Sequence, residues 1–166
     1  MANKQSFTPE EWTKILESTM LAGMAVTAAE PSGLWGVLKE GFASSSALAA
    51  AKSDAGSGEL IKAVVAEYQT SEGRSSVQEA LRKRLAGAKP ADAVQRSLDS
   101  LREVSAIVDA KAPGDAPGFK AWLRSISQNV AEASSEGGFL GIGGVKVSDK
   151  EKATLADISK ALGTSA

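Results

Sequence analysis

Apolar residues recur every three or four positions along this chain, and this spacing constrains its fold more than any other feature. In the first such segment, Trp12, Ile15 and Leu16 fall on one face of a helix, and Val26 extends the pattern. No segment shows the alternation of a half-buried strand, and Val145–Val147 is too short to count as one. The sequence therefore predicts an all-α fold.

Boundary signals divide this pattern into about seven helices joined by short loops. The first should begin at the capping-box sequence 8–11 and end near Ala29. The last should begin after Ser148, whose capping-box partner is Glu151, and end at Gly163. The remaining helices are expected around the apolar residues of 34–42, 60–68, 77–85, 94–108 and 119–130, with breaks at 54–58, 71–73, 87–90 and 113–118.

The length of 166 residues fits a single compact domain, which we place at 9–163 between short tails at 1–8 and 164–166. A chain of this size buries about 70% of its unfolded surface, so it needs no disulfide or metal to fold. Residues 1–7 lack the basic and apolar regions of a signal peptide, and no apolar run approaches the ~18–20 residues of a membrane span. We therefore expect a soluble cytoplasmic protein.

Two function classes are disfavoured by composition. The chain contains neither histidine nor cysteine, so catalysis would rest on carboxylates, Lys, Arg or the single Tyr68, and no catalytic motif is present. We therefore expect a non-enzyme. The net charge is −1, and acidic residues lie among the arginines of 74–102, so no nucleic-acid partner is expected. The basic run 82–84 ends a predicted helix, and we interpret it as a solvated face that complements the helix dipole.

The most unusual stretch lies between the last two predicted helices. Five of its eight residues are glycine and the other three are large and apolar; its sequence is Gly137, Gly138, Phe139, Leu140, Gly141, Ile142, Gly143 and Gly144. A phosphate-binding loop is excluded, because Lys146 is misplaced for the P-loop and occupies the last glycine position of the dinucleotide fingerprint. The apolar residues either contact a membrane or protein partner, or fold back onto the helices.

Carboxylates beside this stretch suggest a further reading as a divalent-metal site. Glu132, Glu136, Asp149 and Glu151 flank the glycines, and oxygen-rich sites suit Ca²⁺ or Mg²⁺. No EF-hand series is present, and the capping box already accounts for Glu151. We favour solvated helix ends over a metal site here.

The helix boundaries also resemble those of a known family. Residues 130–137, 147–151 and 155–163 look like the closing segment of TerB-like tellurite-resistance domains, with an acidic residue before glycine, a Ser-x-x-Glu helix start and a terminal Leu-Gly. The end of the first helix, 26–33, is similar, although Glu-Pro-Ser-Gly replaces the Asp-Gly typical of the first loop and the glycines lengthen the second. The resemblance implies an all-helical fold, a stress-response role or one near membranes, and a divalent cation. The positions matching its acidic helix ends are Glu30, Glu136 and Glu151.

Two functional hypotheses follow. The first is a non-enzymatic cytoplasmic helical module that acts through protein or membrane-surface contact, with the Gly-rich loop 137–144 as its contact site and no cofactor. The alternative is a small ligand- or divalent-metal-binding stress-response domain of TerB-like type.

Overall fold

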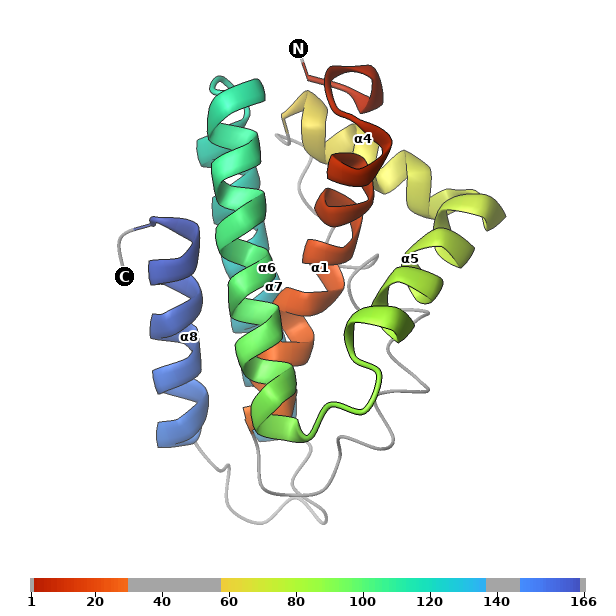
Figure 1. Ribbon diagram of the computed structural model, residues 1–166. Helices are drawn as coiled ribbons and strands as arrows, with labels where there is room; N and C mark the ends of the chain where they lie inside the picture. The colour runs from red at the N-terminus through yellow and green to blue at the C-terminus, as the bar shows by residue number, and fades with distance from the viewer. Residues whose placement is uncertain (1, 30–57, 137–146, 165–166) are drawn as a thin grey trace.

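The computed structural model describes residues 2–29, 58–136 and 147–164, with the backbone alone described at 133–136. Every element within these residues is helical, which confirms the all-α prediction. The elements are η1 (Lys4–Ser6), α1 (Pro9–Ala29), α4 (Glu59–Gln69), α5 (Ser71–Arg84), α6 (Pro90–Lys111), α7 (Ala116–Glu136) and α8 (Asp149–Leu162), as Figure 1 shows. The helix expected around 34–42 lies outside the described residues.

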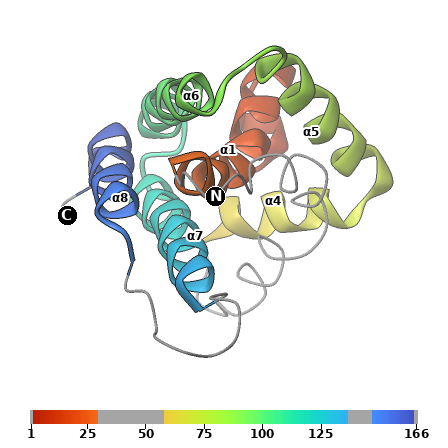
Figure 2. The ribbon, with the colours of Figure 1, turned by 90° about the horizontal axis from the view of Figure 1, so that it is seen from below.

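The central element of the fold is α1. Figure 2, which looks along the bundle, shows α4, α5, α6 and α7 around it, and α8 packs on α6, α7 and α1. Every residue from Ile15 to Ala28 is buried, so this helix is covered on all its faces. Its buried hydroxyls are satisfied within the helix itself; for example, Ser18 donates to the Ile15 carbonyl at 2.6 Å.

Small residues let α7 approach α1 closely. The Ser127 hydroxyl of α7 donates to the Ala22 backbone carbonyl of α1 at 3.0 Å, which requires the two helix backbones to lie near each other. Large apolar side chains fill the remaining space. Those with the least exposure include Ile15 and Leu21 of α1, Leu60 of α4, Leu101 of α6, Phe119 and Leu123 of α7, and Ile158 and Leu162 of α8.

The segment before α1 packs onto this core, although we expected residues 1–8 to form a tail. Ala2 and Phe7 are both buried, and the Phe7 ring stacks on Trp12 with centroids 6.0 Å apart. The Ala2 backbone N–H donates to the Asp115 carboxylate at 3.1 Å. This contact ties the start of the described chain to the turn before α7.

Most predicted helix ends are confirmed, but one predicted break is wrong and another is too wide. The capping box of Ser148 and Glu151 forms, and Gly163 ends α8 in the left-handed conformation with φ 66°. The predicted break at 71–73 is wrong, because these residues form the first turn of α5, where the Thr70 side chain accepts from the Gly73 N–H at 2.9 Å. The predicted break at 113–118 is too wide, because Ala116, Pro117 and Gly118 belong to α7.

Gly73 lies where α4 ends against α5, and a side chain there is expected to destabilise the fold. A Cβ added to Gly73 would lie 2.2 Å from the backbone oxygen of Glu67. Because backbone atoms must move to relieve this clash, Gly73→Ala should lower the free energy of unfolding by about 1–3 kcal/mol, measured by urea denaturation. The control is Gly118→Ala on the exposed side of α7, where a Cβ meets nothing within 4 Å.

Gly118→Ala should raise the free energy of unfolding by about 0.4–1 kcal/mol, because alanine restricts the unfolded chain. Equal effects of the two substitutions would contradict the close approach of α4 and α5 at Gly73.

Candidate functional site

The Gly-rich loop 137–144 predicted as the contact site lies outside the described residues, but both of its neighbouring helices are described. α7 ends at Glu136 and α8 begins at Asp149, and the two helices pack against each other. Figures 1 and 2 show that α7 ends and α8 begins at the same end of the bundle. Residues 137–148 therefore connect two helices that are already neighbours.

Of the three predicted metal-binding residues, only Glu151 has a described side chain. Its Oε2 accepts from the Ser148 N–H at 2.8 Å, and its own N–H donates to the Ser148 hydroxyl at 3.1 Å, so it acts in the expected capping box. Glu30 lies outside the described residues, and of Glu136 only the backbone is described. No group of three or more acidic residues able to hold a metal occurs in the part of the chain that the structure describes. The metal site stays a prediction.

One concave site among the described residues is a groove between α1 and α5. It has a volume of about 560 Å³, within the range of about 300–1,000 Å³ typical of ligand sites. Thr13 and Glu17 line it from α1, and Glu79, Lys83 and Arg84 line it from α5. Figure 1 shows that α5 is inclined to α1 and approaches it at its C-terminal end. The groove therefore lies where these two helices diverge.

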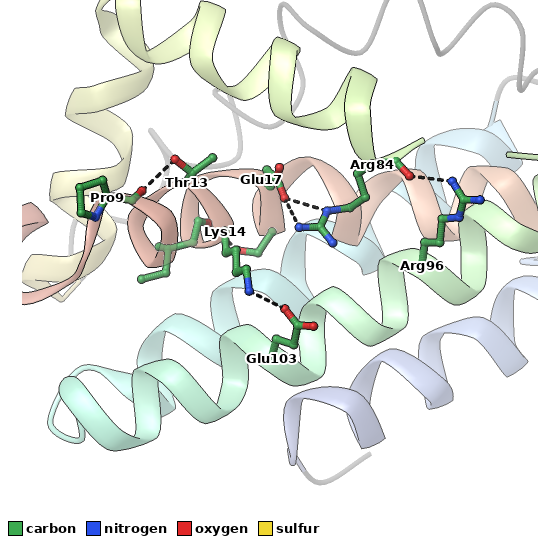
Figure 3. Close-up of polar contacts among 9 residues, drawn as sticks. Pro9, Thr13, Lys14, Glu17, Arg84, Arg96 and Glu103 are labelled. Atoms are coloured by element: carbon green, nitrogen blue, oxygen red, sulfur yellow. Dashed lines mark hydrogen bonds and ion pairs between the residues drawn. The ribbon is translucent and has the colours of Figure 1, made fainter. Parts of the chain in front are cut away.

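A partly buried ion pair lies at the converging end of the groove. Nε and Nη2 of Arg84 lie 2.9 and 2.8 Å from Oε2 of Glu17, so both contacts are to the same carboxylate oxygen. The exposed fraction is 4% for the Glu17 side chain and 25% for that of Arg84. Figure 3 shows the two side chains pointing toward one another from α1 and from the end of α5. The carboxylate is thus far more withdrawn from water than its partner.

Burial has a larger effect on the pKa of Glu17 than Arg84 does. Loss of hydration raises the pKa of the Glu17 carboxyl, and the charge and hydrogen bond of Arg84 lower it by a smaller amount. The net direction is upward from the ordinary value. The ionised carboxylate is therefore less stable here than in water, even with its arginine present.

Neighbouring polar contacts hold the end of α5 in place. Nη1 of Arg96 on α6 donates to the backbone carbonyls of Arg84 and Ala86 at 2.8 and 3.2 Å. Arg84 is the last residue of α5, where a helix leaves its carbonyls without partners, and Ala86 lies just after the C-cap. Lys14 of α1 pairs with Glu103 of α6 at 2.9 Å, as Figure 3 also shows. The contacts of α6 with both α1 and the end of α5 therefore hold the two helices that carry Glu17 and Arg84 in place.

The basic run at the end of α5 is only partly the solvated face that the sequence indicated. Arg82 and Lys83 are exposed and both pair with Glu79 on the same helix, at 2.7 and 3.4 Å. Arg84 differs, because it points to the buried Glu17 on α1. One signal could have found this site: Glu17 is the only charged residue between Ile15 and Ala28, where every other position is apolar, small or hydroxyl-bearing. A charge inside such a run calls for a partner.

No helix within 2–29, 58–136 or 147–164 is long and apolar enough to cross a membrane. Comparison with protein-family models, curated proteins and solved structures finds no match to the chain.

Proposed function

We propose that the protein is a non-enzymatic, cytoplasmic helical module that acts through contact with a protein or membrane surface, made by the Gly-rich loop 137–144. One observation carries this proposal: the connection between α7 and α8 is longer than its ends require. Helix–helix connections in bundles commonly have about 2–8 residues. Positions 137–148 exceed this, although α7 and α8 are packed neighbours joined at one end of the bundle.

The composition of the loop supports a contact role. Extra length in a connection is tolerated at little cost in free energy, so length alone has no functional meaning. Here the added residues include Phe139, Leu140 and Ile142 among five glycines. Each of these apolar side chains contributes about 1.5–3 kcal/mol when fully buried. Three of them are enough for a reversible contact and too few for stable anchoring.

Vesicle flotation tests the lipid form of this contact. We expect the wild-type protein to float with vesicles containing anionic phosphatidylserine, and the Phe139→Ser/Ile142→Ser variant to stay at the bottom of the gradient, because two of the three apolar side chains are removed. A thermal melt of each protein shows whether the variant keeps its fold. Equal flotation of the two proteins, with equal melts, would exclude the loop as the lipid contact.

Photo-crosslinking tests the protein form. A photoreactive residue at position 139 should give discrete crosslinked products in cells, and one at the exposed Gln128 of α7 should not. Absence of flotation together with identical crosslinks from both positions would overturn the proposed function. Either a specific crosslink at 139 or loop-dependent flotation would identify which kind of surface the loop contacts.

A further inference from the structure

The groove between α1 and α5 is a second site, separate from the Gly-rich loop, and its ion pair keeps hydrogen-bonding capacity. Arg84 uses Nε and Nη2, and both lie against Oε2 of Glu17. Within the described residues, no group donates to Oε1 of Glu17 and none accepts from Nη1 of Arg84. Both side chains line the groove. The site therefore offers one acceptor and one donor on adjacent groups.

The charges at this end of the groove select against ionic ligands. A cation that approaches Glu17 meets the positive charge of Arg84, and an anion that approaches Arg84 meets the negative charge of Glu17. At the rim, Lys83 and Glu79 pair with each other at 3.4 Å, so a positive and a negative charge are again side by side. An uncharged group that carries both a donor and an acceptor satisfies the pair without such repulsion, and it keeps the withdrawn carboxylate hydrogen-bonded.

The other lining groups suit a ligand with an aliphatic body. Thr13, Ala80 and Lys83 also line the groove. The side chains of alanine and threonine carry a methyl group, and the lysine stem is aliphatic up to its charged end. The Thr13 hydroxyl already donates to the Pro9 carbonyl at 2.9 Å, so it offers no free proton. A short aliphatic chain that ends in a polar group matches this arrangement.

We propose that the α1–α5 groove binds an uncharged carboxamide, as carried by a glutamine or asparagine side chain of a peptide. The amide N–H₂ donates to Oε1 of Glu17, and the amide oxygen accepts from Nη1 of Arg84. The aliphatic part of the residue lies against Ala80 and Thr13. This proposal does not depend on the function proposed for the Gly-rich loop, because it concerns different helices.

Four blocked amino acids of similar size test the proposal by NMR titration of the ¹⁵N-labelled full chain. They are the N-acetyl, N′-methylamide forms of glutamine, glutamate, lysine and norleucine, which carry an amide, an anion, a cation and an apolar end. The glutamine form should shift the backbone resonances of Glu17 and Ala80 and bind about tenfold more tightly than each of the others, since one added hydrogen-bonded contact changes affinity by about this factor.

Two neighbouring serines on α5 supply matched variants. Ser76 and Ser75 are both exposed, but only Ser76 is among the groove-lining residues. Ser76→Trp should fill the groove and weaken binding of the glutamine form by about tenfold or more, and Ser75→Trp should leave it unchanged. The double variant Glu17→Met/Arg84→Met should bind the glutamine and norleucine forms equally.

Three outcomes would overturn the carboxamide site. The first is tighter binding of the glutamate or lysine form than of the glutamine form, and the second is an equal loss of binding in the two tryptophan variants. The third is that no backbone resonance of α1 or α5 shifts at the highest concentration of the glutamine form. Circular dichroism of each variant confirms that the comparison is made between folded proteins.

Discussion

Arg84→Met is expected to lower the free energy of unfolding by about 3–5 kcal/mol at pH 7, because it leaves the buried Glu17 carboxylate without its hydrogen-bonded counter-charge. The Glu17 side chain is only 4% exposed, so the little water that reaches its carboxylate does not compensate for the loss of the guanidinium. Methionine keeps the aliphatic volume of the arginine stem, which limits the loss of packing. Native proteins have a free energy of unfolding of about 5–15 kcal/mol, so this loss would be a large part of the total. Urea denaturation measures it.

Removing the charge of Glu17, instead of that of Arg84, should change the free energy of unfolding much less. Glu17→Gln removes the charge whose burial is unfavourable, and Arg84, at 25% exposed, retains access to water. We expect a change of less than about 1 kcal/mol at pH 7. The double variant Glu17→Met/Arg84→Met should be as stable as the wild type or more stable, by up to about 4 kcal/mol, because a well-packed apolar pair avoids the desolvation of both charges. Equal losses in the two single variants would contradict this account.

The dependence on pH has a definite sign. Burial raises the pKa of Glu17 above its ordinary value of 4.5 in the folded state. The folded protein then holds a proton that the unfolded chain has released, so the stabilising contribution of the protonated carboxyl is complete below pH 4.5 and is lost as pH rises through the folded pKa. Without Arg84 the folded pKa rises further. The cost of Arg84→Met should therefore be smaller at pH 4.5 than at pH 7, and a constant cost would exclude a buried carboxylate as its origin.

Helix positions were predictable from the sequence because their signals are local. Pro9 at the first position of α1, the capping box of Ser148 and Glu151, and Gly163 after α8 each act within one helical turn. The start of α5 was missed because a glycine normally indicates a break, whereas Gly73 is needed here for the close approach to the Glu67 carbonyl. That requirement depends on how α4 meets α5, and no local pattern contains it.

The groove could not be predicted in the same way. Its ion pair joins residues 67 positions apart, and Arg84 follows two basic residues that are solvated. A charged residue inside an apolar run, Glu17, indicates that a buried partner exists but not which cation it is. The Gly-rich loop is the reverse case. It is conspicuous in sequence, and the described residues define only the two packed helices that it joins.

Phe119→Ala is expected to lower the free energy of unfolding by about 3–5 kcal/mol, because it opens a cavity in the core beside the first turn of α7. Phe119 is fully buried on α7, and its ring lies 5.7 Å from that of Trp122 at an angle of 52°. Loss of this tilted ring contact adds to the loss of buried area. Thermal or urea unfolding followed by tryptophan fluorescence measures the change.

Phe7→Ala is the matched control, since Phe7 also pairs with a tryptophan, at 6.0 Å, and is 7% exposed. Its ring lies on the segment that precedes α1, where the chain can shift to fill the space, so its loss should be smaller by about 1 kcal/mol or more. If the two variants lose equal stability, residues 2–7 unfold together with α1 and α7 and belong to the same cooperative core. If Phe7→Ala loses less stability, and the dependence of the free energy of unfolding on urea concentration is unchanged, the N-terminal segment lies at the margin of that core. Its contact with Asp115 then stabilises the bundle, but the bundle folds without it.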